Sequence, residues 1–315
     1  MSGVNIVATG RALPKRVIDN DELSTFVDTS DEWIYSRTGI KNRYKCEEET
    51  CTSLATEAAR KAFEKAKEKE KIDEDSIGAV IVATTTSDNA FPSTACMVAK
   101  NLGFSETLMA FDISAACSGF VYGLEIARGL LENSKKKYAL VIGSEKLSKI
   151  LNYEDRATCV LFGDGAGAAV IKLDNSKFVH EAYAEGNFEG LHCDGVRGKD
   201  MYLHMDGKAV FKSAVKAFDM AIKDALHDAD MTISEIDHVI CHQANVRIIN
   251  HVAKKYKEDA EKFYINIDKY ANTSAASIPI ALDEMFEKNL IKKGQKLLVV
   301  AFGAGFTWSS AIITA

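Results

Sequence analysis

Three short stretches, far apart in the chain, carry side chains of the kinds that enzymes use in acyl transfer. They centre on Cys117, His242 and Asn272. A cysteine thiolate can attack an acyl carbonyl and hold the acyl group covalently. Imidazole and carboxamide N–H groups can stabilise negative charge that develops on an oxygen. The three side chains together therefore indicate covalent acyl-transfer chemistry.

Cys117 lies in an apolar run, Ala110–Leu124, in which small residues surround the thiol before a helical pattern begins. A thiol at a strand-to-helix junction is near the positive end of the helix dipole, so we expect a lowered pKa and a thiolate. Small neighbours would also let an acyl chain approach closely. The alternative is a purely structural core cysteine, because free cysteine is among the most buried residue types.

His242 and Asn272 each occupy a position in the sequence that is typical of active-site residues. His242 follows the apolar run Val239–Cys241, which is typical of a short buried strand, and Asn272 lies in a loop of small polar residues, Tyr270–Pro279. Residues at the carboxyl end of a strand often line the site of an α/β protein. Taken singly, such a histidine is more often structural and such an asparagine more often belongs to a turn. Their occurrence with Cys117 favours the catalytic interpretation.

Composition limits the class of protein. The chain has 315 residues, 47% of them hydrophobic, and a net charge of −6, which predicts a large core and argues against nucleic-acid binding. The seven cysteines are odd in number and lack a paired spacing, as expected of reduced thiols. The N-terminus lacks a basic, apolar leader, and no apolar run of about 18 residues occurs. We therefore expect a cytoplasmic protein without a membrane span.

Two pairs of apolar runs recur at a nearly constant separation, which indicates a duplicated α/β architecture. Asp75–Thr84 matches Ser234–Gln243 in apolar pattern at a separation of 159 residues, and Tyr138–Gly143 matches Lys296–Ala301 at a separation of 158. The cysteine and asparagine segments fall at corresponding places between these runs. The pattern predicts two halves of alternating strands and helices. The predicted halves are residues 1–172 and 173–315.

Five motifs spread along the chain resemble those of β-ketoacyl-acyl carrier protein synthase III, and the resemblance covers essentially the whole sequence. It implies the thiolase fold, in which two duplicated α/β halves pack in an αβαβα layering. The active site would lie between the halves, with the cysteine from the first and the histidine and asparagine from the second. The motifs are D-T-S-D-E-W-I at Asp28–Ile34, A-A-C-S-G-F around Cys117, H-Q-A-N-V-R-I from His242, A-N-T-S-A-A-S at Ala271–Ser277 and G-A-G-F-T-W at Gly303–Trp308.

The resemblance implies an acyltransferase that initiates type II fatty acid biosynthesis and needs no cofactor. An acyl-CoA primer, expected to be acetyl-CoA, would acylate Cys117. Malonyl-acyl carrier protein would then lose CO2 and condense to give 3-ketoacyl-acyl carrier protein and CoA. His242 Nε2 and Asn272 Nδ2 would stabilise the enolate, and the backbone N–H groups of Cys117 and Ala304 would form the oxyanion hole.

The last motif departs from the family pattern. Family members commonly have G-G-G-F-T-W-G, whereas this chain has Ala304 and Ser309. A backbone donor survives the change to alanine when φ is negative, but a position that needs positive φ would be strained by about 1 kcal/mol or more. The oxyanion assignment therefore depends on the backbone of Ala304.

The resemblance also assigns a tunnel for CoA. The adenine would stack between Trp33 and Arg156, since an aromatic face and a planar guanidinium suit it. Phe91 matches a residue that reaches into the acyl pocket of a partner subunit, which implies a homodimer. Without the motif, an ordinary surface helix would be the preferred interpretation of Trp33. The remaining tunnel residues are Arg37 and Thr38 for the phosphates and Gly207, Phe211 and Asn245 for the pantetheine arm.

Acyl carrier proteins are acidic, so docking on this acidic chain needs a local basic patch. The spacing of Arg247, Lys254 and Lys255 predicts one helix after His242 with these three side chains on a similar side. Each charge alone could be an ordinary solvated residue. The candidate docking residues are Lys212, Gln243, Arg247, Lys254 and Lys255.

Other functions remain open. A thiolase would need a second catalytic cysteine near the C-terminus, a hydroxymethylglutaryl-CoA synthase a glutamate base, and an elongating synthase a second histidine instead of Asn272. The main alternative is a related acyltransferase of secondary metabolism, followed by a non-catalytic CoA-binding protein or a cysteine hydrolase. No metal is expected, because His192, Cys193 and His204 lack a ligand spacing. Primer length stays open, because one methylene changes binding by only about 1 to 3 kcal/mol.

Overall fold

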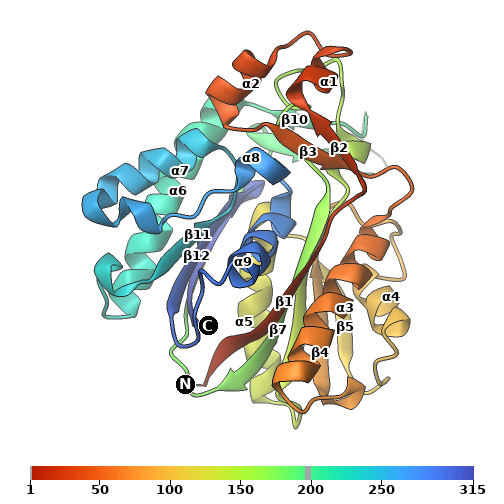
Figure 1. The fold of residues 1–315 in the computed structure, drawn as a ribbon, viewed down its shortest axis with the longest axis vertical. Helices are drawn as coiled ribbons and strands as arrows, with labels where there is room; N and C mark the ends of the chain where they lie inside the picture. The colour runs from red at the N-terminus through yellow and green to blue at the C-terminus, as the bar shows by residue number, and fades with distance from the viewer. Residues whose placement is uncertain (1, 196–199) are drawn as a thin grey trace.

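One large mixed sheet runs through the computed structural model, which describes residues 2–195 and 200–315 (Figure 1). Within these residues the sheet has nine strands, with β8 paired to β13 beside the main path. The main path runs through β11 (His238–Cys241), β12 (Lys296–Gly303), β13 (Gly305–Thr314), β1 (Gly3–Ala12), β7 (Gly165–Asp174), β6 (Tyr138–Glu145), β4 (Ile77–Ala83) and β5 (Met109–Ile113), and β8 is Val179–Asn187.

The strand pairing repeats, which confirms the duplicated α/β fold. In the first half β4 pairs with β6 in parallel, and β6–β7 and β7–β1 are antiparallel. In the second half β11 pairs with β12 in parallel, and β12–β13 and β13–β8 are antiparallel. The two sets are joined by a parallel pairing of β1 with β13 at Asn5 and Thr314.

Helices cover both outer faces and fill the space between the two halves of the sheet, giving the αβαβα layering (Figure 1). One outer layer contains α3 (Cys51–Lys69) and α4 (Thr94–Asn101), and the other contains α6 (Gly207–Asp228) and α7 (Val246–Ala253). The inner layer is α5 (Gly119–Glu132) and α9 (Ser277–Glu287). Helix α9 is buried along nearly its whole length, which fits a helix that is apolar on most sides.

Smaller elements lie at the end of the layers where the catalytic-type residues are found (Figure 1). Ser30 caps α2 by accepting a hydrogen bond from the Trp33 backbone N–H, and Gly39 ends that helix with φ 79°. No described helix is long and apolar enough to cross a membrane. The smaller elements at this end are α1 (Asn20–Ser24), α2 (Asp31–Thr38), α8 (Ile267–Tyr270), β2 (Arg16–Asp19), β3 (Asn42–Lys45), β9 (Leu191–Cys193) and β10 (Leu203–Met205). Along the chain, 3₁₀ helices occur at Glu74–Ser76, Ala116–Ser118, Leu147–Ile150, Ile233–Glu235, Lys254–Lys262 and Ser274–Ala276.

Two equivalent turns lead into the inner helices. Ala116 and Ser274 have positive φ angles of 44° and 50°, and each begins a short 3₁₀ turn before α5 or α9. A strand of the opposite half closes on each turn. A Cβ added at Gly303 of β12 would lie 2.6 Å from the Cys117 backbone N, and one at Gly143 of β6 would overlap the carbonyl oxygen of Ala275. Each half therefore supports the turn of the other at close range.

Candidate active site

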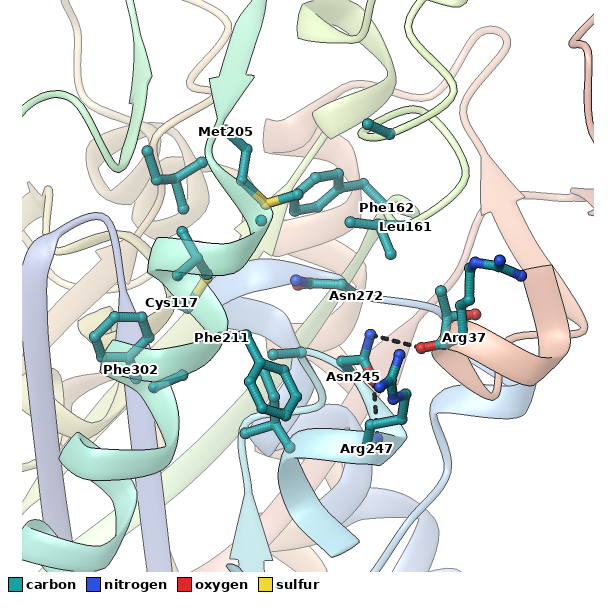
Figure 2. A pocket seen from close by; sticks show the side chains of 18 of the residues that line it. Arg37, Cys117, Leu161, Phe162, Met205, Phe211, Asn245, Arg247, Asn272 and Phe302 are labelled. Carbon is teal, nitrogen blue, oxygen red and sulfur yellow. Dashed lines mark hydrogen bonds between the residues drawn. The ribbon is translucent and has the colours of Figure 1, made fainter. Parts of the chain in front are cut away.

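A cavity of about 600 Å³ brings Cys117, His242 and Asn272 together, as the sequence predicted. Figure 2 shows Cys117 on one side of this cavity and Arg37 on the opposite side, with the Asn272 side chain between them. The thiol comes from the turn before α5, the imidazole from the end of β11, and the carboxamide from the turn before α9. The cavity is thus formed at the junction of the two halves.

Cys117 does not have the lowered pKa that its helix position suggested. Burial raises the pKa of the thiol to about 12, and a hydrogen bond with the Ser274 side chain lowers it by less than burial raises it. The residue is only 8% exposed. Loss of hydration disfavours the thiolate more than the positive end of α5 favours it. Cys117 is therefore a neutral thiol at neutral pH and must lose its proton during attack.

His242 is held as a neutral imidazole whose outer nitrogen is a donor. Its residue is 1% exposed, and burial lowers the pKa of the ring to about 3. Nδ1 lies 2.7 Å from Ser277 Oγ, which also accepts a 3.3 Å hydrogen bond from the Gln243 backbone N–H. One lone pair of that hydroxyl already accepts from the backbone, and we assign its proton to Nδ1. In this assignment Nε2 carries the ring proton.

Asn272 is oriented so that its amide N–H₂ is free to donate. Its backbone is fixed by hydrogen bonds with Leu161 (2.9 Å) and Gly163 (3.0 Å) of the first half. Its side-chain Oδ1 accepts a 2.8 Å hydrogen bond from the Ser274 backbone N–H. This bond assigns the oxygen and leaves Nδ2 as the group that can serve the cavity. The site thus has two oriented N–H donors beside one thiol.

Ala304 is not strained by its departure from the family pattern. The described non-glycine residues with positive φ do not include Ala304, whereas Gly305 has φ 137°. The Thr307 hydroxyl lies within 3.0 Å of the Ala115 carbonyl oxygen and 3.2 Å of the Ala304 carbonyl oxygen, which ties this turn to the Cys117 turn. Gly303 lines the cavity and Ala304 is its neighbour. Ser309 is buried with no hydrogen-bond partner for its hydroxyl in the described part of the chain, and nothing in the structure explains it.

The predicted CoA residues lie at the mouth and walls of the cavity, apart from Arg156 and Phe91. The Arg37 and Arg156 guanidinium carbons lie 4.6 Å and 5.2 Å from the centroid of the Trp33 ring. Arg156 is therefore stacked against Trp33 itself, and a base could enter between them only if Arg156 moved. Phe91 is 86% exposed and lies outside the cavity of its own chain. The predicted residues that line the cavity are Trp33, Arg37, Thr38, Gly207, Phe211 and Asn245.

The predicted docking residues differ in how far they are exposed and in what they contact. Lys212, Arg247 and Lys254 are exposed, and the last two share a shallow groove beside the cavity mouth. Gln243 is wrong as a docking residue: it is 1% exposed and bonds to Cys241, Tyr264 and Asn266 inside the protein. The predicted single helix is also wrong, because α7 ends at Ala253. Lys254 and Lys255 follow in a 3₁₀ helix, where Lys255 pairs with Asp219 at 3.2 Å.

The sequence did not indicate several residues that position the site or line its cavity. Ser274 and Ser277 lie within the Asn272 motif, and their spacing around the start of α9 could have identified them as hydrogen-bond partners. Apolar wall residues carried no separate signal, because periodicity alone makes them look like ordinary core. No described group of three or more His, Cys, Asp or Glu residues could hold a metal ion. The apolar wall residues include Val160, Leu161, Phe162, Leu191, Met205 and Val210.

Comparison with known proteins identifies the family. Family models described as 3-oxoacyl-[acyl-carrier-protein (ACP)] synthase III and its C-terminal domain match residues 111–185 and 226–315. The beta-ketoacyl-[acyl-carrier-protein] synthase III of Clostridium botulinum strain Loch Maree is 46% identical, over 99% of both chains. The 3-oxoacyl-[acyl-carrier-protein] synthase III of Aquifex aeolicus superposes with a TM-score of 0.93 at 45% identity, covering 99% of this chain and 100% of that one.

A more distant structure is the priming beta-ketosynthase from the R1128 polyketide biosynthetic pathway. It has a TM-score of 0.91 at 31% identity, covering 99% of this chain and 96% of that one. The fold, the matched residues and the full-length similarity agree with the motifs around the thiol, the imidazole and the carboxamide. The chain belongs to the β-ketoacyl-acyl carrier protein synthase III family.

Proposed function

We propose that this enzyme transfers a short acyl group from acyl-CoA to Cys117 and condenses it with malonyl-acyl carrier protein. The products are 3-ketoacyl-acyl carrier protein, CoA and CO2, and the reaction would start type II fatty acid biosynthesis. One observation carries the proposal: a thiol and two oriented N–H donors, His242 Nε2 and Asn272 Nδ2, serve the same cavity. The names of the full-length relatives support the same activity.

The first half-reaction is acylation. The Cys117 sulfur attacks the thioester carbonyl, its proton leaves, and the bond between the acyl carbon and CoA sulfur breaks. The tetrahedral oxyanion is held by the backbone N–H groups of Cys117 and Ala304. Negative φ at Ala304 is compatible with this role. The apolar cavity walls exclude water and protect the acyl-enzyme from hydrolysis.

The second half-reaction is decarboxylation followed by condensation. Loss of CO2 from the malonyl thioester moves negative charge onto the thioester oxygen, where His242 Nε2–H and Asn272 Nδ2–H stabilise it. The carbanion then attacks the acyl carbonyl, and Cys117 leaves as a thiolate. A neutral imidazole suits this step, because it donates a hydrogen bond without giving its proton away.

The assembly around this chemistry is also a proposal. The halves 1–172 and 173–315 supply the thiol and the two donors respectively, and β7 ends at Asp174 beside that boundary. The exposed Phe91 supports a homodimer in which it covers the acyl pocket of the partner subunit. Acyl-CoA and acyl carrier protein are the partners, and the cytoplasm is the expected location.

The primary test is the mass of the intact protein after mixing with acetyl-, propionyl- or isobutyryl-CoA, with Cys117→Ser as the matched control. We expect an acyl adduct on the wild type alone, which disappears on addition of malonyl-acyl carrier protein as 3-ketoacyl-acyl carrier protein forms. The preferred adduct names the primer. An adduct that persists would favour the alternative, a transferase of secondary metabolism. No adduct would contradict the catalytic proposal.

The basic groove gives a second prediction. Arg247 lines both the cavity and this groove, whereas Lys254 lines only the groove, so Lys254→Glu separates carrier docking from CoA binding. We expect a roughly five- to tenfold higher KM for malonyl-acyl carrier protein, about 1 kcal/mol, and an unchanged KM for acyl-CoA. Lys292→Glu makes the same charge change at another exposed position outside the groove and should leave both constants unchanged. Equal rises for both substrates in Lys254→Glu would argue against the docking role.

A further inference from the structure

A buried carboxylate lies behind the catalytic cysteine and takes no part in the steps described above. Glu145, the last residue of β6, is 0% exposed and does not line the cavity. It accepts hydrogen bonds from the Thr85 backbone N–H (3.2 Å) and from the hydroxyls of Thr86 and Ser274 (3.2 Å for Ser274). Among the described ion pairs none involves Glu145. A buried carboxylate without a cation is costly, so its presence calls for a reason.

Ser274 connects this carboxylate to the nucleophile. Its hydroxyl donates to Glu145 Oε1, and its interaction with the Cys117 thiol lowers the pKa of that thiol. Because the serine proton points to the carboxylate, the serine oxygen is the acceptor for the thiol proton. The backbone of Ser274 has a φ of 50° and is held by the hydrogen bond that its N–H donates to Asn272 Oδ1. The result is a continuous path from thiol to hydroxyl to carboxylate.

His242 is a poor acceptor for the thiol proton. Burial lowers the pKa of its ring to about 3, and its Nδ1 is already bonded to the Ser277 hydroxyl. Since Cys117 is a neutral thiol, its attack on a thioester needs another acceptor. The carboxylate at the end of the serine path is the group that remains.

We infer that Glu145 is a positioning residue for acyl transfer, which acts through Ser274 to take the proton that the Cys117 thiol releases. The inference rests on the proposed function. In acylation the thiol proton passes to Ser274 Oγ while the serine proton passes to Glu145, and CoA thiolate leaves and is protonated by water. In condensation Cys117 leaves as a thiolate, and the proton returns from Glu145 through Ser274. One proton is consumed in each full turnover, as the release of neutral CoA and CO2 requires.

The surrounding charges make this role testable by pH. Burial raises the pKa of Glu145 to about 7. Burial also raises the pKa of the two facing thiols, Cys117 and Cys51 of α3, to about 12, and it lowers that of His242 to about 3. The adjacent ammonium of Lys146 is turned to the Glu49 carbonyl oxygen, and that of Lys149 bonds to the carbonyl oxygens of residues 86 and 87.

The sign of the pH effect follows from these protonation states. Below about pH 7 Glu145 is protonated and cannot accept another proton, whereas above it the carboxylate is free to do so. The acylation rate should therefore rise with pH, about tenfold per unit below the pKa, and level off above it. The two thiols and the imidazole keep their protonation states across pH 5.5–8.5, so none of them can produce this inflection.

The experiment measures single-turnover acylation of the full chain by acetyl-CoA from pH 5.5 to 8.5, using rapid quench and intact mass. Glu145→Gln removes the acceptor, and Ser274→Ala breaks the path while leaving the carboxylate in place. We expect both variants to acylate roughly 10- to 100-fold more slowly at pH 8 and to lose the inflection near pH 7. Cys51→Ala is the matched control, because it alters a buried neighbour of the same network outside the path. It should keep the wild-type inflection.

The outcomes separate the relay from the proposed function. Wild-type rates and an unchanged inflection in Glu145→Gln would overturn the relay alone. Should that variant fail to fold, the same result in Ser274→Ala would overturn it. A wild-type chain that forms no adduct with any acyl-CoA would overturn the proposed function and the relay together.

Discussion

His242→Ala and Asn272→Ala are each expected to slow decarboxylation of malonyl-acyl carrier protein by about 100- to 1,000-fold while Cys117 is still acylated by acyl-CoA. Each substitution removes one N–H donor from the position where enolate charge develops. The donor directions are set by Ser277 on Nδ1 of the imidazole and by the Ser274 N–H on the carboxamide oxygen. Neither ring nor amide is needed to take the thiol proton, so the first half-reaction is spared.

Release of labelled CO2 measures the decarboxylation step, and intact mass measures acylation. Asn175→Ala, at an exposed position between β7 and β8 outside both the cavity and the basic groove, is a suitable control and should leave both steps unchanged. Equal losses in the two half-reactions would refute the division of labour. It would then follow that the imidazole or carboxamide also takes part in attack by the thiol.

The duplicated fold could be predicted from the sequence because its signal is local and repeated. Apolar runs at separations of 158 and 159 residues correspond to strands that pair in the same order, β4–β6 and β11–β12. The positive-φ residues Ala116 and Ser274 are also 158 apart (274 − 116), so the repeat extends to the turns. Motifs around Cys117 and Asn272 then indicated which turn carries the thiol and which carries the carboxamide.

The protonation states could not be predicted in this way, because they depend on residues remote in sequence. Position at the start of α5 favours a thiolate, but Gly303 and Ser274 of the other half close over Cys117 and remove its water. Gln243 shows the same limit. It was predicted to be a docking residue, yet hydrogen bonds to the 264–266 segment hold it inside. Burial by a distant segment reversed both local expectations.

Glu145 was missed for a related reason. A carboxylate after an apolar strand commonly marks the point where a strand leaves the core, and nothing in the local sequence distinguishes Glu145 from that ordinary case. The role proposed for Glu145 depends on its hydrogen bond with Ser274, which is 129 residues away in the sequence. The two side chains meet only because the turns of the two halves meet. Residues that act by such contacts become visible only in three dimensions.

Gly303→Ala is expected to reduce acylation of Cys117 by about 100-fold, even though the substitution adds one methyl group. The new Cβ would lie 2.6 Å from the Cys117 backbone N and 3.1 Å from its Cβ, so the β12 end and the nucleophile turn must move apart. A displacement of about 1 Å from the productive geometry is enough for a loss of this size. Overpacking should also lower the free energy of unfolding by about 1 to 3 kcal/mol.

Single-turnover acylation and thermal unfolding distinguish this local effect from general damage. Gly186→Ala is the matched control, because nothing lies within 4 Å of the Cβ that it would add and its φ is not in the positive range. It should change neither quantity. Normal acylation in a folded Gly303→Ala protein would mean that the thiol tolerates displacement, and close support of the Cys117 turn by β12 would then have no catalytic consequence. Lost acylation in a protein that is still folded at the assay temperature, with a melting temperature lowered only as far as the overpacking predicts, is the result that ties the geometry of this turn to the chemistry.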